Sequence, residues 1–326
     1  MIQFSPSRYA GIRVVVLGAS GFIGRWTARV LCQQGADVCL AVRDAAVAAP
    51  IFAAYDIAGD VVELNLGEET AVTNLIAQYR PAITFNLAGY GVDRSERDET
   101  TAYQINAYLL QTLAEAVASH PHPNWGGQQI IHVGSALEYG VLGNDLVEDS
   151  TPQPTTLYGQ SKLAGTQILQ QFAANGRVKA ITARLFTIYG VGEHNGRLLP
   201  SLLTVARTNQ PLPMTAGLQK RDFTYVADVV EGLLRLGLLP DTQADNIVNL
   251  ATGKLTTVRT FVETAATVLN IPPANLQFGA LPTRAEEMEH APISISRLKQ
   301  WLNWVPAITI AEGVQDTAVF PAHDQR

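Results

Sequence analysis

Residues 12–24 read I-R-V-V-V-L-G-A-S-G-F-I-G, an apolar run that passes directly into a turn with three glycines. The apolar run predicts a buried strand, and the amphipathic stretch that starts at Phe22 predicts a helix. Glycines at Gly18, Gly21 and Gly24 let the backbone of the turn approach a pyrophosphate, while the first N–H groups of the helix face the phosphates. The segment therefore predicts a strand–turn–helix unit that binds a dinucleotide.

The same alternation continues along the first half of the chain. Apolar runs predict strands at residues 12–17, 38–42, 61–65, 82–88, 129–133 and 178–184. Helices are predicted between them, the longest at about 99–119 and 157–174. Strands that are apolar throughout and alternate with helices indicate a parallel sheet covered on both faces. We therefore predict an α/β fold, a Rossmann-like doubly wound parallel sheet whose ligands bind at the carboxyl ends of the strands.

The alternation stops after residue 184, where loop-rich segments begin. Residues 223–226 and 246–250 are predicted to be strands that rejoin the sheet. We predict a dinucleotide-binding domain built from residues 11–185 and about 222–252. A smaller C-terminal substrate lobe is predicted from about 186–221 and 253–326.

The composition restricts the class of protein. The 326 residues are 47% hydrophobic and 16% charged, which is typical of a well-buried cytoplasmic enzyme. A net charge of -6 without a basic stripe argues against a nucleic-acid partner. Cys32 and Cys39 are the only cysteines and predict buried free thiols, with neither a disulfide framework nor a metal site. No signal peptide is apparent, and no apolar stretch approaches the roughly 20 residues of a membrane span, so no membrane partner is expected.

Tyr158 and Lys162, in the stretch Y-G-Q-S-K, form the strongest catalytic signal. The phenol of a tyrosine has an unperturbed pKa of about 10, too high for a good base at neutral pH. A lysine four residues later lies on the same face of a helix. We expect its charge to favour the phenolate and to lower the pKa of Tyr158 toward the working range.

Six ordered motifs carry a resemblance to a known family. They are G18-A-S-G-F-I-G24, N86-L-A-G89, G134-S-A-L-E-Y-G140, Y158-G-Q-S-K162, R184-L-F-T-I-Y-G190 and R221-D-F-T-Y-V-A-D228. In this order they resemble the extended short-chain dehydrogenases/reductases, and within them the nucleotide-sugar branch, the NAD-dependent epimerase/dehydratase family. The resemblance spans the chain from about Ile12 to Glu312.

The resemblance implies a role for each motif residue. Tyr158 would be the general acid/base, Lys162 would hold the nicotinamide ribose, and Ser135 would hydrogen-bond the same substrate oxygen as Tyr158. Asn106 matches the family's helix asparagine, and Asn65 stands where the family usually has an aspartate toward the adenine. The cofactor-binding residues implied are Gly18, Ser20, Gly21, Phe22, Ile23, Gly24, Arg43, Asn65, Leu66, Leu87, Ala88, Gly89, Asn106, Tyr158 and Lys162.

The end of the second strand, A41-V-R-D44, bears on the cofactor's phosphate. NAD-using relatives carry an acidic residue there for the ribose hydroxyls, and here Val42 occupies that position. Arg43 is able to pair with a 2′-phosphate and to stack on adenine. Asp44 would restore an acid if the register slipped by one residue. NADP(H) is therefore favoured, with NAD(H) as the alternative.

The expected substrate is a nucleotide-diphosphate sugar. Arg221 matches the family's arginine toward the diphosphate, Arg284 its arginine near the nucleoside, and Arg197 is a third candidate. Thr187 replaces an asparagine that is usual at a sugar-diphosphate contact. In this family the long helices at about 99–119 and 157–174 pair across a twofold axis, so a homodimer is predicted. No catalytic metal is expected, because no cluster of His, Cys and carboxylates has ligand spacing.

The residues after Ser135 restrict which of the family's reactions is expected. Dehydratases of this family carry an Asp-Glu pair there, whereas this chain has Ala136 and Leu137. Glu138 comes one place late and is expected to face the other way along an extended segment. The favoured activity is NADP(H)-dependent 4-keto reduction of an NDP-4-keto-6-deoxyhexose. An NDP-sugar 4-epimerase with retained NAD is the alternative. A catalytically silent dinucleotide-binding relative is the second alternative, which the presence of Ser135, Tyr158 and Lys162 opposes.

Overall fold

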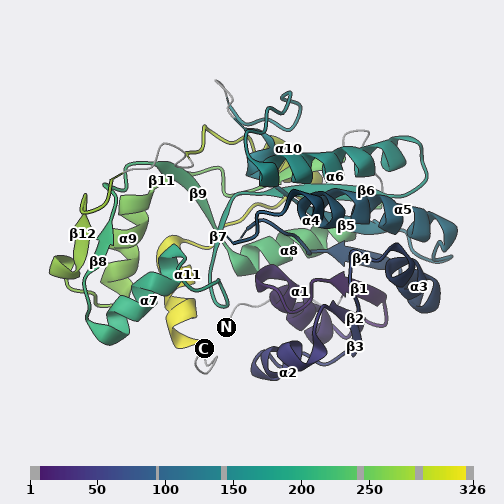
Figure 1. Ribbon diagram of the computed structural model, residues 1–326, viewed down its shortest axis with the longest axis horizontal. Helices are drawn as coiled ribbons and strands as arrows, with labels where there is room; N and C mark the ends of the chain where they lie inside the picture. Colours follow the sequence, from purple (N-terminus) through teal and green to yellow (C-terminus); the bar gives the residue numbers. More distant parts are fainter. Residues whose placement is uncertain (1–7, 93–94, 141–144, 241–245, 283–288, 321–326) are drawn as a thin grey trace.

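A seven-stranded parallel sheet forms the centre of the protein in the computed structural model, which describes residues 8–92, 95–140, 145–240, 246–282 and 289–320 (Figure 1). The strand order is β10-β6-β5-β4-β1-β2-β3. The strands are β1 (Arg13–Leu17), β2 (Asp37–Val42), β3 (Asp60–Glu63), β4 (Ile83–Asn86), β5 (Ile130–Ser135), β6 (Ala180–Leu185) and β10 (Ile247–Leu250). The order reverses between β1 and β4, and doubly wound folds bind their ligands at such a switch point. The predicted fold class is confirmed.

Helices cover both faces of the sheet, as the pattern predicts. Along β1, Val14 and Val16 enter one hydrophobic core, and Val15 and Leu17 enter the other. This alternation follows from the two-residue period of a strand. The first core is covered by α1 (Phe22–Gln33), α2 (Ala45–Ala54) and α8 (Val226–Gly237). The second is covered by α3 (Glu69–Tyr79), α5 (Leu109–Ser119) and α6 (Leu157–Ala174).

The helix predicted at about 99–119 is interrupted near its middle. It runs as α4 (Glu99–Tyr103), the π-helical turn η1 (Gln104–Tyr108) and α5. Local π turns of this kind occur frequently at functional sites. Here the turn contains Asn106, which is fully buried, although nothing in the sequence pattern distinguishes this turn from an ordinary helix.

A second, smaller sheet follows the carboxyl end of β6. Its order is β11-β9-β7, formed by β7 (Thr187–Tyr189), β9 (Lys220–Tyr225) and β11 (Leu255–Thr257). The prediction that residues 223–226 rejoin the main sheet is therefore wrong, because β9 pairs with β7 and β11. The strand at 246–250 does rejoin the main sheet, as β10 beside β6. An apolar pattern identifies a strand, but it does not identify the strand's partner.

The remaining elements lie mostly to one side of the large sheet (Figure 1). They are α7 (Leu198–Thr208), β8 (Leu212–Met214), α9 (Val258–Val268), η3 (Pro273–Asn275), β12 (Leu276–Phe278), α10 (Ser296–Leu302) and α11 (Ile310–Val319). Asp228, in α8, accepts hydrogen bonds from the backbone N–H groups of Ala307 and Ile308, both at 2.8 Å. These bonds fasten the segment before α11 to the sheet domain. The division into two domains at the predicted boundaries stays a prediction.

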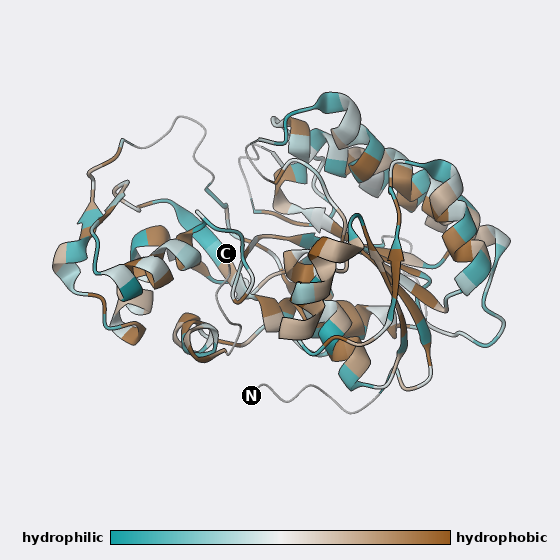
Figure 2. Cartoon of the chain, turned by 60° about the horizontal axis from the view of Figure 1, so that its bottom comes forward, coloured by the Kyte–Doolittle hydropathy of each residue, from teal (hydrophilic) through white to brown (hydrophobic). Residues whose placement is uncertain are grey.

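Hydrophobic residues concentrate on the central strands and on the helix faces that cover them (Figure 2). Across the part of the chain that the structure describes, no helix has both the length and the apolar character needed to cross a bilayer.

Candidate active site

The glycine turn between β1 and α1 is shaped for a close backbone approach. Gly18 has a φ of +75°, and a Cβ atom on it would lie 3.0 Å from the Cα of Ala88. A Cβ on Gly24 would collide with the carbonyl oxygen of Gly18. Gly21 is the N-cap of α1, and no side chain caps the first N–H groups of this helix. These free donors and the glycine cradle fit the pyrophosphate of a dinucleotide.

Arg25, in α1, stabilises the glycine turn through hydrogen bonds to its backbone, a role that no motif in the sequence indicates. Its guanidinium donates to the carbonyl oxygens of Gly21 at 3.1 Å and Ser20 at 2.8 Å. The indole of Trp26 donates to the carbonyl of Val191 at 2.7 Å. Together these bonds connect the glycine turn to the loop that follows β7.

The side chain of Lys162 reaches from α6 to the ends of two strands. Its Nζ donates to the carbonyl oxygen of Val133 at 3.0 Å and lies 3.5 Å from that of Ala88. A Cβ on Gly89 would come within 3.4 Å of the same nitrogen. Burial lowers the pKa of Lys162 to about 8, and the negative charge of Glu138 opposes this shift.

Tyr158 lies one turn before Lys162, and the Nζ atom of Lys162 is 6.0 Å from the centre of the tyrosine ring. The side chain of Thr156 caps α6 by accepting from the N–H of Gly159 at 3.1 Å. Burial raises the pKa of Tyr158, Glu138 adds to the rise, and the positive charge of Arg197 opposes it. The predicted lowering of the tyrosine pKa is therefore wrong for the protein alone, because the cost of desolvating a phenolate dominates. The phenol holds its proton at neutral pH.

Ser135 ends β5 and starts the 3₁₀ turn η2 (Ala136–Glu138). Its Oγ accepts a hydrogen bond from the N–H of Leu137 at 3.1 Å, which leaves the hydroxyl proton for another acceptor. A Cβ on Gly159 would collide with the carbonyl of Leu137, so the start of α6 packs tightly on this turn. The structure thus brings the Ser135 turn next to the helix end that carries Tyr158.

Asn106 orders the loop above Tyr158 and Lys162. Its Oδ1 accepts from the N–H of Tyr90 at 3.0 Å, and its Nδ2 donates to the Tyr90 carbonyl at 2.7 Å and to Ser161 at 2.9 Å. Both amide hydrogens are thereby used within the protein. In the same loop, a Cβ on Gly91 would lie 3.1 Å from the ring of Tyr158. Asn106 therefore positions this loop, and only its Oδ1 retains capacity for a ligand.

Arg43 and Asp44 differ in what they contact. Arg43 is exposed at the end of β2. Asp44 is the N-cap of α2, and its Oδ1 accepts from the N–H of Val47 at 2.9 Å.

Asn65, predicted to lie near the adenine, is exposed too, and its Oδ1 accepts from the N–H of Gly67 at 3.0 Å, which closes the turn after β3. The neighbouring Leu66 is half-buried.

Glu138 is fully buried in η2, so the prediction that it faces the other way along an extended segment is wrong. Its Oε1 accepts from the N–H of Ser135 at 2.8 Å, and its Oε2 accepts from Nε of Arg184 at 2.9 Å. The capping of η2 by Ser135 bends the chain into a turn. The carboxylate consequently points inward, and the absence of dehydratase activity stays a prediction that rests on Ala136 and Leu137.

Comparison with known proteins gives the family. The family model described as NAD dependent epimerase/dehydratase family matches residues 14–251. The chain belongs to the NAD-dependent epimerase/dehydratase family.

Relatives in this family cover nearly the whole chain. A dTDP-6-deoxy-L-talose 4-dehydrogenase (NAD(P)(+)) of Kitasatospora kifunensis is 29% identical over 319 residues, covering 94% of this chain and 95% of its own. A dTDP-4-dehydrorhamnose reductase of Aggregatibacter actinomycetemcomitans is 26% identical over 226 residues, covering 69% of this chain and 67% of its own. The crystal structure of dTDP-glucose 4,6-dehydratase from Bacillus anthracis in complex with NAD superposes with a TM-score of 0.81 at 18% identity, covering 97% and 98% of the two chains. At that identity the structural likeness shows the fold alone.

Three of the residues predicted to contact the substrate, Thr187, Arg197 and Arg221, lie on the small sheet or at the start of α7. Thr187 starts β7, and half-buried Arg221 lies in β9 opposite Thr256. Arg197 is exposed at the start of α7, close enough for its charge to act on Tyr158. Arg284 lies outside the described residues.

Asp222, next to Arg221 in the motif R221-D-F-T-Y-V-A-D228, stabilises the fold through hydrogen bonds of its carboxylate. Its carboxylate accepts from the N–H and hydroxyl of Thr252 at 3.0 and 2.8 Å and from the N–H of Lys254 at 3.1 Å. These bonds hold β9 against the segment that leads into β11.

Among the described residues, no group of three or more His, Cys, Asp and Glu side chains is arranged to hold a metal ion.

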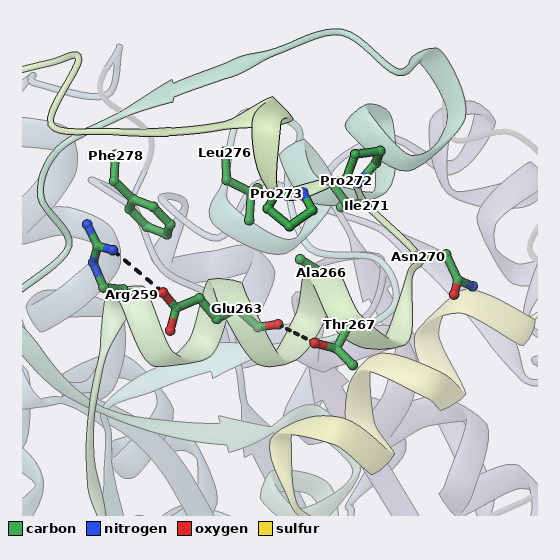
Figure 3. Close-up of a pocket in the computed structure, with 10 residues that line it drawn as sticks. All are labelled: Arg259, Glu263, Ala266, Thr267, Asn270, Ile271, Pro272, Pro273, Leu276 and Phe278. Carbon is green, nitrogen blue, oxygen red and sulfur yellow. Dashed lines mark hydrogen bonds and ion pairs between the residues drawn. The ribbon is translucent and has the colours of Figure 1, made fainter.

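A separate groove of about 730 Å³ lies on the small lobe, along α9 and beside β12 (Figure 3). Arg259 and Glu263 line one wall and form an ion pair of 3.6 Å. None of the residues predicted for the active site lines this groove.

Proposed function

We propose that this member of the family is an NADP(H)-dependent reductase of a nucleotide-linked 4-keto-6-deoxyhexose. The observation that carries the proposal is the half-buried, protonated phenol of Tyr158, whose ring centre lies 6.0 Å from Nζ of Lys162 on a helix that begins against the Ser135 turn. A phenol that holds its proton suits the reduction direction, in which a carbonyl oxygen receives a proton. The names of two relatives, a 6-deoxy-talose 4-dehydrogenase and a 4-dehydrorhamnose reductase, support oxidation–reduction at this carbon.

Ser135, Tyr158 and Lys162 have different roles in the proposed reduction. The glycine turn and Lys162 would hold a dinucleotide, which when bound would supply the hydride for the sugar carbonyl. Ser135 donates its hydroxyl proton in a hydrogen bond to the carbonyl oxygen, which stabilises the negative charge that develops there. Tyr158 transfers its phenolic proton to that oxygen and becomes a phenolate. The charge of Lys162 stabilises this phenolate until solvent returns the proton.

The test of the proposal is direct. The purified protein is mixed with NADPH and a nucleotide-linked 4-keto-6-deoxyhexose, and both NADPH and sugar are followed. A reductase consumes one NADPH for each sugar reduced. Interconversion of 4-epimers by protein that purifies with bound NAD, and without net consumption of dinucleotide, would instead establish the epimerase alternative. Absence of any turnover, with binding retained, would support the silent relative.

Arg43 supports the choice of NADP(H). It is exposed after β2, and the neighbouring carboxylate of Asp44 is already engaged with the N-terminus of α2. A guanidinium at this position offers a charge-assisted partner to a 2′-phosphate. Such a bond contributes on the order of 1.5–3 kcal/mol, so we expect a preference for NADPH over NADH of roughly ten- to hundredfold.

We expect Arg43→Ala to remove most of the preference for NADPH and to leave the Kd for NADH nearly unchanged. Fluorescence titration with both dinucleotides measures this. Arg207→Ala is the matched control, because Arg207 is also an exposed arginine, in the last turn of α7. A wild-type preference for NADH would contradict the assignment and make Asp44 the residue that binds the ribose.

The diphosphate of the substrate is proposed to lie between Arg221 and Arg197. Both residues lie on the segments that follow the carboxyl end of the main sheet, and Arg197 acts electrostatically on Tyr158. Thermal shifts with UDP, GDP, CDP and dTDP would identify the base, since a ligand at 100 times its Kd adds about 2.7 kcal/mol to the free energy of unfolding.

A homodimer is proposed through the helices of the second core. α5 and α6 pack side by side, and the tyrosine Tyr108 beside them is 59% exposed. We expect a dimeric mass by light scattering at micromolar concentration. Replacement of Tyr108 by Glu should shift the mass toward the monomer, whereas the same change at Val47, a 61% exposed residue on α2, should not.

A further inference from the structure

Glu138 lies directly beneath the turn that presents Ser135. One carboxylate oxygen accepts the N–H of Ser135 at 2.8 Å, while the Oγ of Ser135 accepts the N–H of Leu137 at 3.1 Å. These two bonds form a reciprocal capping box around η2. The strand clears space for the carboxylate, since a Cβ on Gly134 would lie 2.5 Å from its Oε1. Glu138 therefore holds the backbone of Ser135, while the N–H of Leu137 holds its hydroxyl oxygen.

The second carboxylate oxygen of Glu138, Oε2, also has a hydrogen-bond partner. It accepts from Nε of Arg184 at 2.9 Å, and both partners are almost completely buried. The guanidinium of Arg184 stacks over the ring of Tyr139 at 4.4 Å and donates to the carbonyl of Glu148 at 3.4 Å. A buried carboxylate with both oxygens bonded has no freedom to turn toward a substrate. This side chain is consequently part of the support of the site.

The charge of Glu138 acts on both members of the helix pair. It raises the pKa of Tyr158 and that of Lys162. The other charged groups that act on Tyr158 are Arg197, which lowers its pKa, and Glu96, which raises it. Besides Tyr158 and Lys162, the titratable groups around Glu138 include Arg184 from β6 and Tyr139, which follows its turn, with Glu148 beyond the arginine. Buried His132 of β5 is close enough to Lys162 for the charge of the lysine to lower its pKa.

Resting on the proposed function, we propose that Glu138 is a positioning residue for the reduction. It holds the backbone of Ser135 in the orientation that leaves the hydroxyl proton free for the substrate oxygen, and it places a fixed, buried negative charge beneath the site. No other acidic residue occurs in residues 135–140, so this assignment concerns one identifiable side chain.

The first test measures the charge effect without any substrate. The chain has five lysines, so a lysine-labelled protein gives few NMR signals. They are Lys162, Lys179, Lys220, Lys254 and Lys299. The signal of Lys162 is assigned as the one that disappears in Lys162→Met. Lys162 is expected to titrate near its pKa of about 8 in the wild type. In Glu138→Gln, which keeps an acceptor for Ser135, we expect titration about one pH unit lower. Glu148→Gln is the matched control, because this buried carboxylate of the same cluster accepts from Asn249 at 2.9 Å.

The second test uses the reduction. In Glu138→Gln the alkaline limb of the kcat profile should move to lower pH, since both Tyr158 and Lys162 would lose their protons more easily. In Glu138→Ala, kcat should fall by about 100-fold, the cost of a small misplacement of a reacting group, with the Kd for NADPH within a few-fold. If Glu138→Gln does not fold because Arg184 is left unpaired, Glu138→Asp tests the positioning instead, because it keeps the charge while its shorter side chain is expected to lose the bond to the N–H of Ser135 and to lower kcat.

The outcomes separate the two proposals. An unchanged titration of Lys162 in Glu138→Gln, or an equal shift in Glu148→Gln, overturns the role of Glu138 whatever the enzyme's substrate. If the titration shifts as expected but no nucleotide-linked ketosugar is reduced by the wild type, the proposed function fails and the electrostatic role of Glu138 stands.

Discussion

Tyr158→Phe is expected to lower the turnover number by about 100-fold or more, the range for loss of a positioned acid. The substitution removes only the phenolic oxygen, so the packing of the ring against Gly91 is kept. The Kd for dinucleotide should stay within a few-fold, because the glycine turn and Lys162 are unchanged. Steady-state kinetics and fluorescence titration measure the two quantities.

The control for this variant is Tyr79→Phe, at the C-terminal end of α3 and remote from the Ser135 turn. It should retain wild-type turnover. Near-normal activity of Tyr158→Phe would remove Tyr158 from the mechanism and, with it, the observation on which the proposed reduction rests.

Arg184→Met is expected to lower the free energy of unfolding by about 3–5 kcal/mol, the cost of leaving one charge of a buried pair without its partner. Arg184 is 1% exposed and Glu138 is fully buried, so water does not replace the lost guanidinium. Denaturant unfolding of variant and wild type measures the difference.

Arg13→Met is the control, since the Arg13–Asp37 pair is 49% and 56% exposed and should change stability by no more than about 1 kcal/mol. An equal loss in both variants would mean that burial of the ion pair is not the cause.

The parts of the site that were predictable are those made by neighbours in the chain. The glycine turn, the tyrosine–lysine pair and the serine at the end of β5 each appear as a short motif. The structure places the turn and the serine at the carboxyl ends of β1 and β5, which are separated only by β4, and Lys162 reaches the end of β5 from α6. Lys162 falls one helical turn after Tyr158 because the period of the α-helix demands it. The bounds of α6 agree with the predicted helix for the same local reason.

The parts that were missed depend on residues far apart in the sequence. Arg184 is 46 positions beyond Glu138, and its pairing with that carboxylate leaves no trace in the motif G-S-A-L-E-Y-G. Arg25 supports the glycine turn through backbone carbonyls, which any sequence would offer. The pKa of Tyr158 was predicted in the wrong direction because the spacing to Lys162 was known, whereas the burial of the phenol was not.

The sequence by itself determined the six strands of residues 12–184 and the long helices among them, the doubly wound sheet and the family, because hydrophobic period and motif spacing are properties of adjacent residues. Only the tertiary structure decided that β9 leaves the main sheet, that Asp44 caps α2, that Glu138 turns inward to Arg184, and that Tyr158 keeps its proton. Strand partners, ion pairs and desolvation arise from contacts between distant segments, and these exist only once the chain has folded.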